Sequence, residues 1–123
     1  MVVCVGTLLS ALPAHAKDQI PPDFWGIWGV SKEECADDDG PNFNTVIAAD
    51  GIEQYENHCR LRSIKAQGAA TLVGLSCEAE GSRYANTFKL AMTPQEALVL
   101  TMRGEYYKGE KVLALQRCPY RKR

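Results

Sequence analysis

The chain has 123 residues, of which 46% are hydrophobic and 24% are charged, and its formal net charge is −1. This length allows one domain with one modest core, and the near-zero net charge gives no indication of a nucleic-acid-binding protein. The charges are unevenly distributed, since residues 17–56 contain ten acidic and two basic side chains, whereas residues 57–123 contain five acidic and twelve basic ones. Such asymmetry can steer a charged partner, but we expect the two parts to lie side by side and neutralise each other.

The first sixteen residues are typical of a secretory signal peptide. An apolar run from Val2 to Leu12 is followed by Ala14-His15-Ala16, which resembles a signal-peptidase site. The run is too short to span a membrane. We therefore predict cleavage after Ala16 and a periplasmic or secreted protein that begins at Lys17.

Alternation of apolar and polar residues, the mark of half-buried strands, dominates the rest of the chain. Glycine, asparagine and proline between the alternating runs predict repeated chain reversals. The predicted strands cover residues 24–31, 43–49, 52–57, 59–66, 70–79, 83–92, 97–103 and 110–118. An alternative is a two-turn helix that begins near Thr93, where Pro94 and Glu96 have helix-start spacing, but we favour a turn and a strand.

Eight short strands with tight connections predict an up-and-down antiparallel sheet, which leaves two exposed edges unless it closes. A closed barrel of eight strands has a lumen that side chains can fill. Closure brings the start of the first strand to the end of the last, so Trp28 and Arg117 should face each other at one mouth and stack. Gly26 would allow a bend or a close approach by another stretch of backbone. The predicted fold is thus an all-β, disulfide-bonded barrel over residues 24–118.

Four cysteines remain after cleavage, and an even number in a small exported chain indicates two disulfides. Zinc is not expected, because there is no C-x-x-C pair and His58 is the one histidine of the mature chain. Strand topology favours Cys35 with Cys59, since both fall at the same end of the barrel, and this leaves Cys77 with Cys118. The alternative joins Cys59 to Cys77 across a hairpin that turns near Gln67.

The combination of Gly26-x-Trp28 on the first strand and Leu113-x-Leu115-x-Arg117 on the last resembles the signature of the calycin superfamily. Among calycins, the chain is most similar in size to the small periplasmic inhibitors of bacterial alkaline metalloproteases. The order of Cys35 and Cys59 is also similar to the disulfide pair of those inhibitors. The resemblance covers most of the mature chain by layout.

This resemblance implies that the segment before the first strand inserts into the cleft of a protease. The corresponding residues are predicted to form an extended arm stiffened by two prolines, which lowers the ordering cost of binding. Deletion of the arm is expected to abolish inhibition and to leave the thermal stability nearly unchanged. The predicted partner-binding residues are Lys17, Asp18, Gln19, Ile20, Pro21, Pro22, Asp23 and Trp25.

Trp25 and Trp28 are expected on opposite faces of one strand, so that Trp28 is structural and Trp25 lies either at the rim, facing a partner, or under the arm. Residues 34–40 form an acidic loop without the ligand spacing of a calcium site. His58 lacks an obvious serine partner and is expected to face solvent. Tyr106 and Tyr107 are expected in an ordinary hairpin, although a partner-binding rim is conceivable.

Taken as a whole, the sequence predicts an exported, non-enzymatic and monomeric binding protein without cofactor or metal, most concretely a peptidase inhibitor. The alternatives are a carrier of small apolar ligands or a structural protein of the cell envelope. The large inward residues of the last three strands would largely fill so small a barrel, which favours binding on the outside. Residues 119–123 form a short basic tail.

Overall fold

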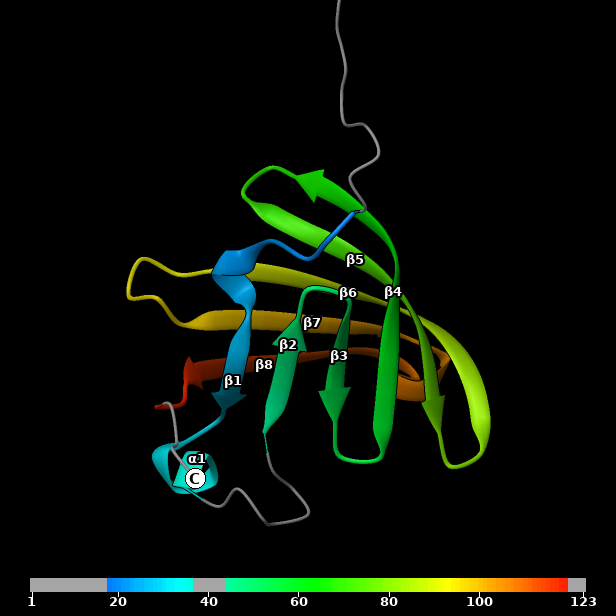
Figure 1. Ribbon diagram of the computed structural model, residues 1–123, viewed down its shortest axis with the longest axis horizontal. Helices are drawn as coiled ribbons and strands as arrows, with labels where there is room; N and C mark the ends of the chain where they lie inside the picture. Colours follow the sequence, from blue (N-terminus) through cyan, green and yellow to red (C-terminus); the bar gives the residue numbers. More distant parts are fainter. Residues whose placement is uncertain (1–17, 37–43, 120–123) are drawn as a thin grey trace, which may run out of the picture.

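The structure is a computed structural model that describes residues 18–36 and 44–119. Eight antiparallel strands follow one another in sequence order and close into a barrel, which confirms the predicted up-and-down architecture (Figure 1). Residues 1–17, which comprise the predicted signal peptide and Lys17, residues 37–43 and residues 120–123 lie outside the described residues. The elements are η1 (Pro22–Phe24), β1 (Gly26–Gly29), α1 (Lys32–Ala36), β2 (Thr45–Ala48), β3 (Gly51–Gln54), β4 (Asn57–Gln67), β5 (Ala70–Ala79), β6 (Ser82–Met92), β7 (Leu98–Gly104), η2 (Glu105–Tyr107) and β8 (Gly109–Arg117).

All eight predicted strands are present. The largest difference is at the third strand, which ends at Gln54 rather than at residue 57. Tyr55 and Glu56 form the turn between β3 and β4, and Gln54 pairs directly with Asn57. Glu56 has a φ of 55°, a left-handed conformation that ends a strand. The alternating pattern alone did not reveal this two-residue turn.

Barrel closure depends on the pairing of β1 with β8. Trp28 lies opposite Arg117 and Gly29 opposite Gln116, in the register expected from the sequence. The Cys118 backbone N–H donates to the carbonyl of Ile27 at 2.8 Å and extends this seam by one hydrogen bond. The ends of the sheet are therefore joined, and neither is left as an unpaired edge.

The segment between β6 and β7 is a turn and not a helix, as favoured above. The hydroxyl oxygen of Thr93 accepts hydrogen bonds from the backbone N–H groups of Gln95 and Ala97, at 3.2 and 3.0 Å. The backbone N–H of Thr93 in turn donates to the carbonyl of Ala97 at 2.8 Å. Glu96 adopts a φ of 65°, which interrupts any helix that starts at Pro94.

The lumen of the barrel is a packed hydrophobic core. Trp28 and Phe88 are fully buried at its centre, together with residues from all strands. The inward residues expected from the last three strands are confirmed, with Met92 and Leu113 partly buried at the edge of the core. The other six are Phe88, Leu90, Leu98, Leu100, Met102 and Leu115, each no more than 2% exposed.

The helix α1 was not predicted. The Glu34 backbone N–H donates to the Ser31 hydroxyl at 3.1 Å, and the Glu34 carboxylate accepts from the backbone N–H of Val30 at 2.8 Å. This is close to the capping box that a serine followed three residues later by glutamate can form, so the sequence did carry a signal for the helix. Of the described helices, none is both long and apolar enough to cross a bilayer.

The disulfides are Cys35–Cys118 and Cys59–Cys77, so the preferred pairing was wrong and the alternative for Cys59 was correct. Cys59 and Cys77 are directly opposite in the β4–β5 register, with 4.0 Å between their Cα atoms. Cys35 on α1 lies beside the end of β8 because β1 and β8 are neighbours. Cys35 and Cys59 do lie at the same end of the barrel, as predicted. The preferred pairing was wrong because two strands separate these cysteines around the circumference of the barrel.

We predict that the double substitution Cys35→Ala/Cys118→Ala lowers the free energy of unfolding by about 4 kcal/mol, because this disulfide closes a long loop of the unfolded chain. The two cysteines are 83 residues apart, compared with 18 for Cys59 and Cys77. Urea unfolding measures the effect. Non-reducing peptide mapping supplies the control, and a Cys35–Cys59 peptide would contradict the observed pairing.

Candidate partner-binding site

The N-terminal segment, residues 18–25, lies across the mouth of the barrel at which β1 begins (Figure 1). The Ile20 side chain is fully buried in the barrel core, and its backbone N–H donates to the carbonyl of Ala49 at 2.9 Å. Phe24 is also buried and belongs to the 3-10 turn η1, in which Pro21 and Pro22 accept backbone hydrogen bonds. The segment is therefore anchored, and residues 22–24 turn instead of remaining extended as predicted.

Arg117 connects this segment to the closing seam. Its guanidinium lies over the ring of Trp28, 4.3 Å from the ring centroid. The same guanidinium donates to the backbone carbonyls of Trp25 and Asp23, at 2.7 and 3.0 Å. The predicted stacking of Arg117 on Trp28 is thus confirmed. The two hydrogen bonds, which anchor the N-terminal segment, were not predicted, because every residue has a backbone carbonyl and the sequence does not show which ones accept a hydrogen bond.

Gly26 provides the space for this guanidinium. A Cβ atom at position 26 would lie 2.8 Å from Nη1 of Arg117, closer than two such atoms can approach. Gly26 also has a φ of +139°, which residues with a side chain rarely adopt. The expectation of a close approach is confirmed, although the approaching group is a side chain.

Of the predicted partner-binding residues that the structure describes, some are buried or half-buried, and the others are exposed. Ile20 faces the core, so it anchors the segment and is not available to a partner. The earlier expectation that removal of residues 17–23 leaves stability unchanged is wrong, because removal of a buried isoleucine costs about 2–5 kcal/mol. Pro21 is half-buried. The exposed members are Asp18, Gln19, Pro22 and Asp23.

Trp25 lies just before β1. The rule that side chains alternate between the two faces of a strand therefore does not determine where its side chain points. Its ring is half-buried and packs against the core cluster. The indole N–H donates to the carbonyl of Ile20 at 2.7 Å. Trp28 makes a similar bond to the carbonyl of Phe24, at 2.9 Å. Both tryptophans therefore hold the N-terminal segment in place, and Trp25 keeps a partly exposed edge beside it.

The opposite end of the barrel is closed by η2 and contains buried polar groups. Tyr107 accepts a hydrogen bond from Asn57 at 3.0 Å and donates to Gln54 at 3.3 Å. Burial raises the pKa of the Tyr107 hydroxyl far above its ordinary value, so the proton needed for this donation is retained. Tyr106 and Tyr107 contact each other edge to face and lie in the connection of the β7–β8 hairpin, as expected, because Gly104 pairs directly with Gly109.

Asn86 lies near the same end and is 3% exposed. Neither polar atom of its amide has a hydrogen-bond partner among the described residues. A Cβ atom at Gly104 would lie 2.2 Å from Oδ1 of Asn86, so the amide occupies the space that a side chain at position 104 would need. Polar residues in this part of the lumen were not predicted from the sequence.

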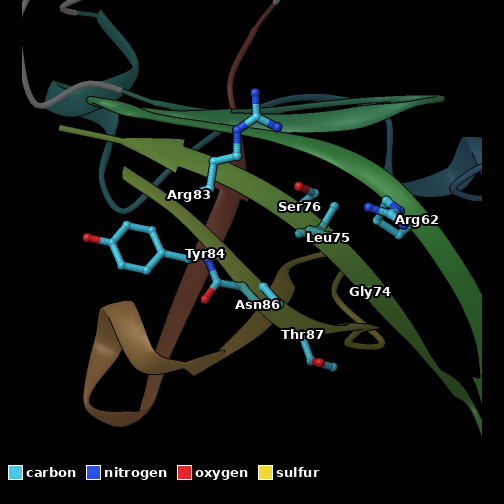
Figure 2. Close-up of a pocket in the computed structure, with 9 residues that line it drawn as sticks. Arg62, Gly74, Leu75, Ser76, Arg83, Tyr84, Asn86 and Thr87 are labelled. Atoms are coloured by element: carbon cyan, nitrogen blue, oxygen red, sulfur yellow. The ribbon is translucent and has the colours of Figure 1, made fainter. Parts of the chain in front are cut away.

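The outer face of β4 to β8 bears most of the positive charge. Arg62, Ser76, Arg83 and Thr87 surround a shallow depression over β4, β5 and β6 (Figure 2). Nδ1 of His58 contacts the carboxylate of Glu53, and this is the one contact of its kind between the acidic and basic parts of the chain within residues 18–36 and 44–119. The two parts lie side by side along the β3–β4 and β1–β8 pairings.

Catalytic and metal sites were not predicted, and the described residues offer few candidates for either. His58 is an exposed surface residue, as expected, and its Nδ1 contacts the carboxylate of Glu53. No group of three or more potential metal ligands occurs within the parts of the chain that the structure describes. The N-terminal segment offers a partner hydrogen-bonding groups, the two carboxylates of Asp18 and Asp23, and apolar contacts.

We predict that Arg117→Met lowers the free energy of unfolding by about 2 kcal/mol, because it removes the ring contact and two hydrogen bonds. Amide hydrogen exchange at Ile20 should accelerate as the segment loosens. Arg103→Met is the control, since Arg103 has an exposed ion pair with Glu110 that is worth about 0.5 kcal/mol. Equal effects of the two substitutions in urea unfolding would refute the proposed anchoring role.

We also predict that Gly26→Ala destabilises the protein by more than Gly109→Ala. The two glycines have similar φ angles, +139° and +122°, which residues with a side chain rarely adopt, so the backbone cost of alanine is similar at both positions. A Cβ atom at Gly109 meets nothing within 4 Å, whereas one at Gly26 displaces the Arg117 guanidinium. Thermal unfolding of the two variants therefore measures the contribution of the clash. A midpoint for Gly26→Ala at or above that of Gly109→Ala would show that the space is not required.

No protein-family model, curated protein or solved structure matches this chain. The fold is therefore established by the strand pairing itself.

Proposed function

We propose that this protein is an exported, non-enzymatic binding protein that contacts a secreted peptidase with its N-terminal segment. The observation that carries the proposal is the rigid attachment of this segment to a barrel whose lumen is filled. A filled lumen directs binding to the outer surface, and an anchored segment offers a preformed surface there. The two disulfides support export to an oxidising compartment.

The filled lumen argues against the alternative of an apolar-ligand carrier. Ligand-binding pockets are concave and mostly apolar, and they usually have volumes of about 300–1,000 Å³. Here the centre of the barrel is occupied by Trp28, Phe88 and the leucines of β6, β7 and β8, which are fully or almost fully buried. Ile20 and Phe24 occupy the mouth where β1 begins. A carrier with this core would have to displace its own side chains.

The anchored segment favours recognition by a partner protein. Binding by a flexible segment requires ordering of the chain, which subtracts from the affinity. Here that ordering is already achieved by Ile20, Trp25 and Arg117, which hold the backbone through three hydrogen bonds of 2.7–3.0 Å. Asp18 and Gln19 are left exposed at the outer end. The segment is thus preorganised where the inhibitor family contacts proteases.

The calycin-like inhibitor family remains the best model for the partner class. The eight-stranded barrel, the first-strand Gly26-x-Trp28 and the last-strand Arg117 support this assignment. The disulfides depart from it, because Cys35 is joined to Cys118 and not to Cys59. This disulfide fixes α1 against the end of β8, and neither of its cysteines belongs to the N-terminal segment. We therefore keep the peptidase as the proposed partner.

An inhibition screen of the purified exported protein tests this proposal. The panel comprises secreted metallopeptidases and serine peptidases, with lysozymes as a further class of secreted enzyme. We expect inhibition of at least one peptidase, and Asp18→Ala/Gln19→Ala should raise its inhibition constant about tenfold, as for residues at the centre of an interface. Neither substitution touches the buried anchor, so the stability should be maintained.

Lys32→Ala/Glu33→Ala on α1 is the matched control, since both side chains are exposed and lie away from the segment. Equal inhibition constants for the two double variants would rule out the segment as the contact site. Failure to inhibit any member of the panel would reject the peptidase as the partner.

A further inference from the structure

Two shallow depressions on the outside of the barrel are not explained by the proposed inhibition. The first has a volume of about 570 Å³ and lies over β4, β5 and β6. The second has a volume of about 400 Å³ and lies over β5 to β8, next to the end of the β4–β5 hairpin. Thr87 lines both, so the two depressions are adjacent on the sheet, and we treat them together as one groove. We call this the outer groove.

Basic side chains lie along the outer groove, and several have no acidic neighbour. Arg83 and Arg103 each form one ion pair, with Glu78 and Glu110. The other two cations that line the groove, Arg62 and Lys89, are exposed and form no ion pair with any residue in the described ranges. Lys65 is also exposed and unpaired within those ranges, and it lies beside the groove, opposite Leu72. Three unpaired cations in and beside one groove create a local positive field that attracts a polyanion.

The strand register fixes the spacing of these charges. Lys65 and Lys89 flank Leu72 in one row across β4, β5 and β6. Two strand separations place their backbones about 10 Å apart. In an extended acidic peptide, side chains on one side recur about every 7 Å, which is shorter than the spacing of the two lysines. In a polysaccharide with an acid group on every second ring, the acid groups are farther apart, which agrees better with the spacing of the lysines.

A β-bulge brings Arg62 to the edge of the groove. The β4–β5 register shifts between Leu61 and Ser63, so Arg62 is the extra residue. Bulges of this kind redirect a side chain and are frequent next to binding sites. Opposite the bulge, a Cβ atom at Gly74 would lie 2.4 Å from the Ser63 hydroxyl. The absence of a side chain at Gly74 therefore keeps the floor of the groove low.

The groove is lined by hydroxyl and amide groups between the cations. Ser76, Thr87, Thr101 and Gln67 provide hydrogen-bond donors and acceptors. Figure 2 shows Ser76 between Arg83 and Arg62. This alternation of cations and hydroxyl groups matches a sugar chain that carries both acidic groups and free hydroxyls.

Other polyanions fit the groove less well. Single-stranded nucleic acids require exposed aromatic rings for base stacking. Tyr84, the aromatic residue that lines the first depression, belongs to the inward row opposite Cys77, and its ring packs against Tyr106 with 5.2 Å between centroids. A planar membrane would contact the margins of a concave groove and leave its floor unfilled.

We propose that the outer groove binds an acidic polysaccharide. The cations Arg62 and Lys89 pair with its sulfate, phosphate or carboxylate groups. Thr87, in the part shared by both depressions, bonds to its hydroxyl groups. No residue of the N-terminal segment lines this groove, so the two sites consist of different side chains.

Binding of dextran sulfate to the exported protein, followed by isothermal titration calorimetry, tests the proposal. We expect binding that weakens with added salt, and no binding of uncharged dextran. Arg62→Ser/Lys89→Ser should weaken binding about tenfold, because it removes two charge-assisted contacts. The fold should be unaffected, since exposed substitutions of this type change stability by no more than about 0.5 kcal/mol.

Lys32→Ser/Lys111→Ser is the charge-matched control, because it removes two exposed cations outside the groove. Equal weakening by the two double variants would show that binding is not localised and would overturn the proposal. Thr87→Val should weaken binding of dextran sulfate but not of polyglutamate. Tighter binding of polyglutamate or of phosphatidylglycerol vesicles than of dextran sulfate, or no binding at low salt, would also overturn it.

Discussion

The guanidinium of Arg117 connects three parts of the molecule that are far apart in the sequence. It covers the ring of Trp28, pairs the last strand with the first, and holds the backbone of residues 23 and 25. Arginine suits this position because its planar group can stack on a ring and donate in its own plane at the same time. One side chain therefore contributes both to barrel closure and to the position of the N-terminal segment, so its loss should weaken both.

The short stretch FWGIWG, residues 24–29, is explained by this arrangement. Its two tryptophans donate to backbone carbonyls of the N-terminal segment, and its two glycines leave space for groups from the far end of the chain. Gly26 admits the Arg117 guanidinium. Gly29 lies against the sulfur atoms of Cys35 and Cys118, where a Cβ atom would be 3.0 to 3.2 Å from them. The same seam is thus secured by stacking, by hydrogen bonds and by a covalent bond.

A filled lumen limits the functions that the fold can perform. Because leucine, phenylalanine and tryptophan side chains occupy the interior, recognition is left to the outer surface. That surface offers two chemically different regions. The N-terminal segment presents carboxylates, an amide and proline on an anchored backbone, whereas the outer groove presents unpaired cations among hydroxyl groups. The two regions share no residue, so one molecule offers two separate binding surfaces.

The sequence by itself determined the strands, the closed barrel and the contact between Trp28 and Arg117. Alternation and turn residues are local signals, eight strands avoid exposed edges by closing, and closure brings the start of the first strand to the end of the last. The sequence also carried the capping signal of Ser31 and Glu34 for α1. Only the tertiary structure decided the pairing of Cys35 with Cys118, the burial of Ile20 and the adjacency of the two outer depressions. These depend on distances around the barrel and on contacts with backbone carbonyls, which no pattern of side chains along the chain records.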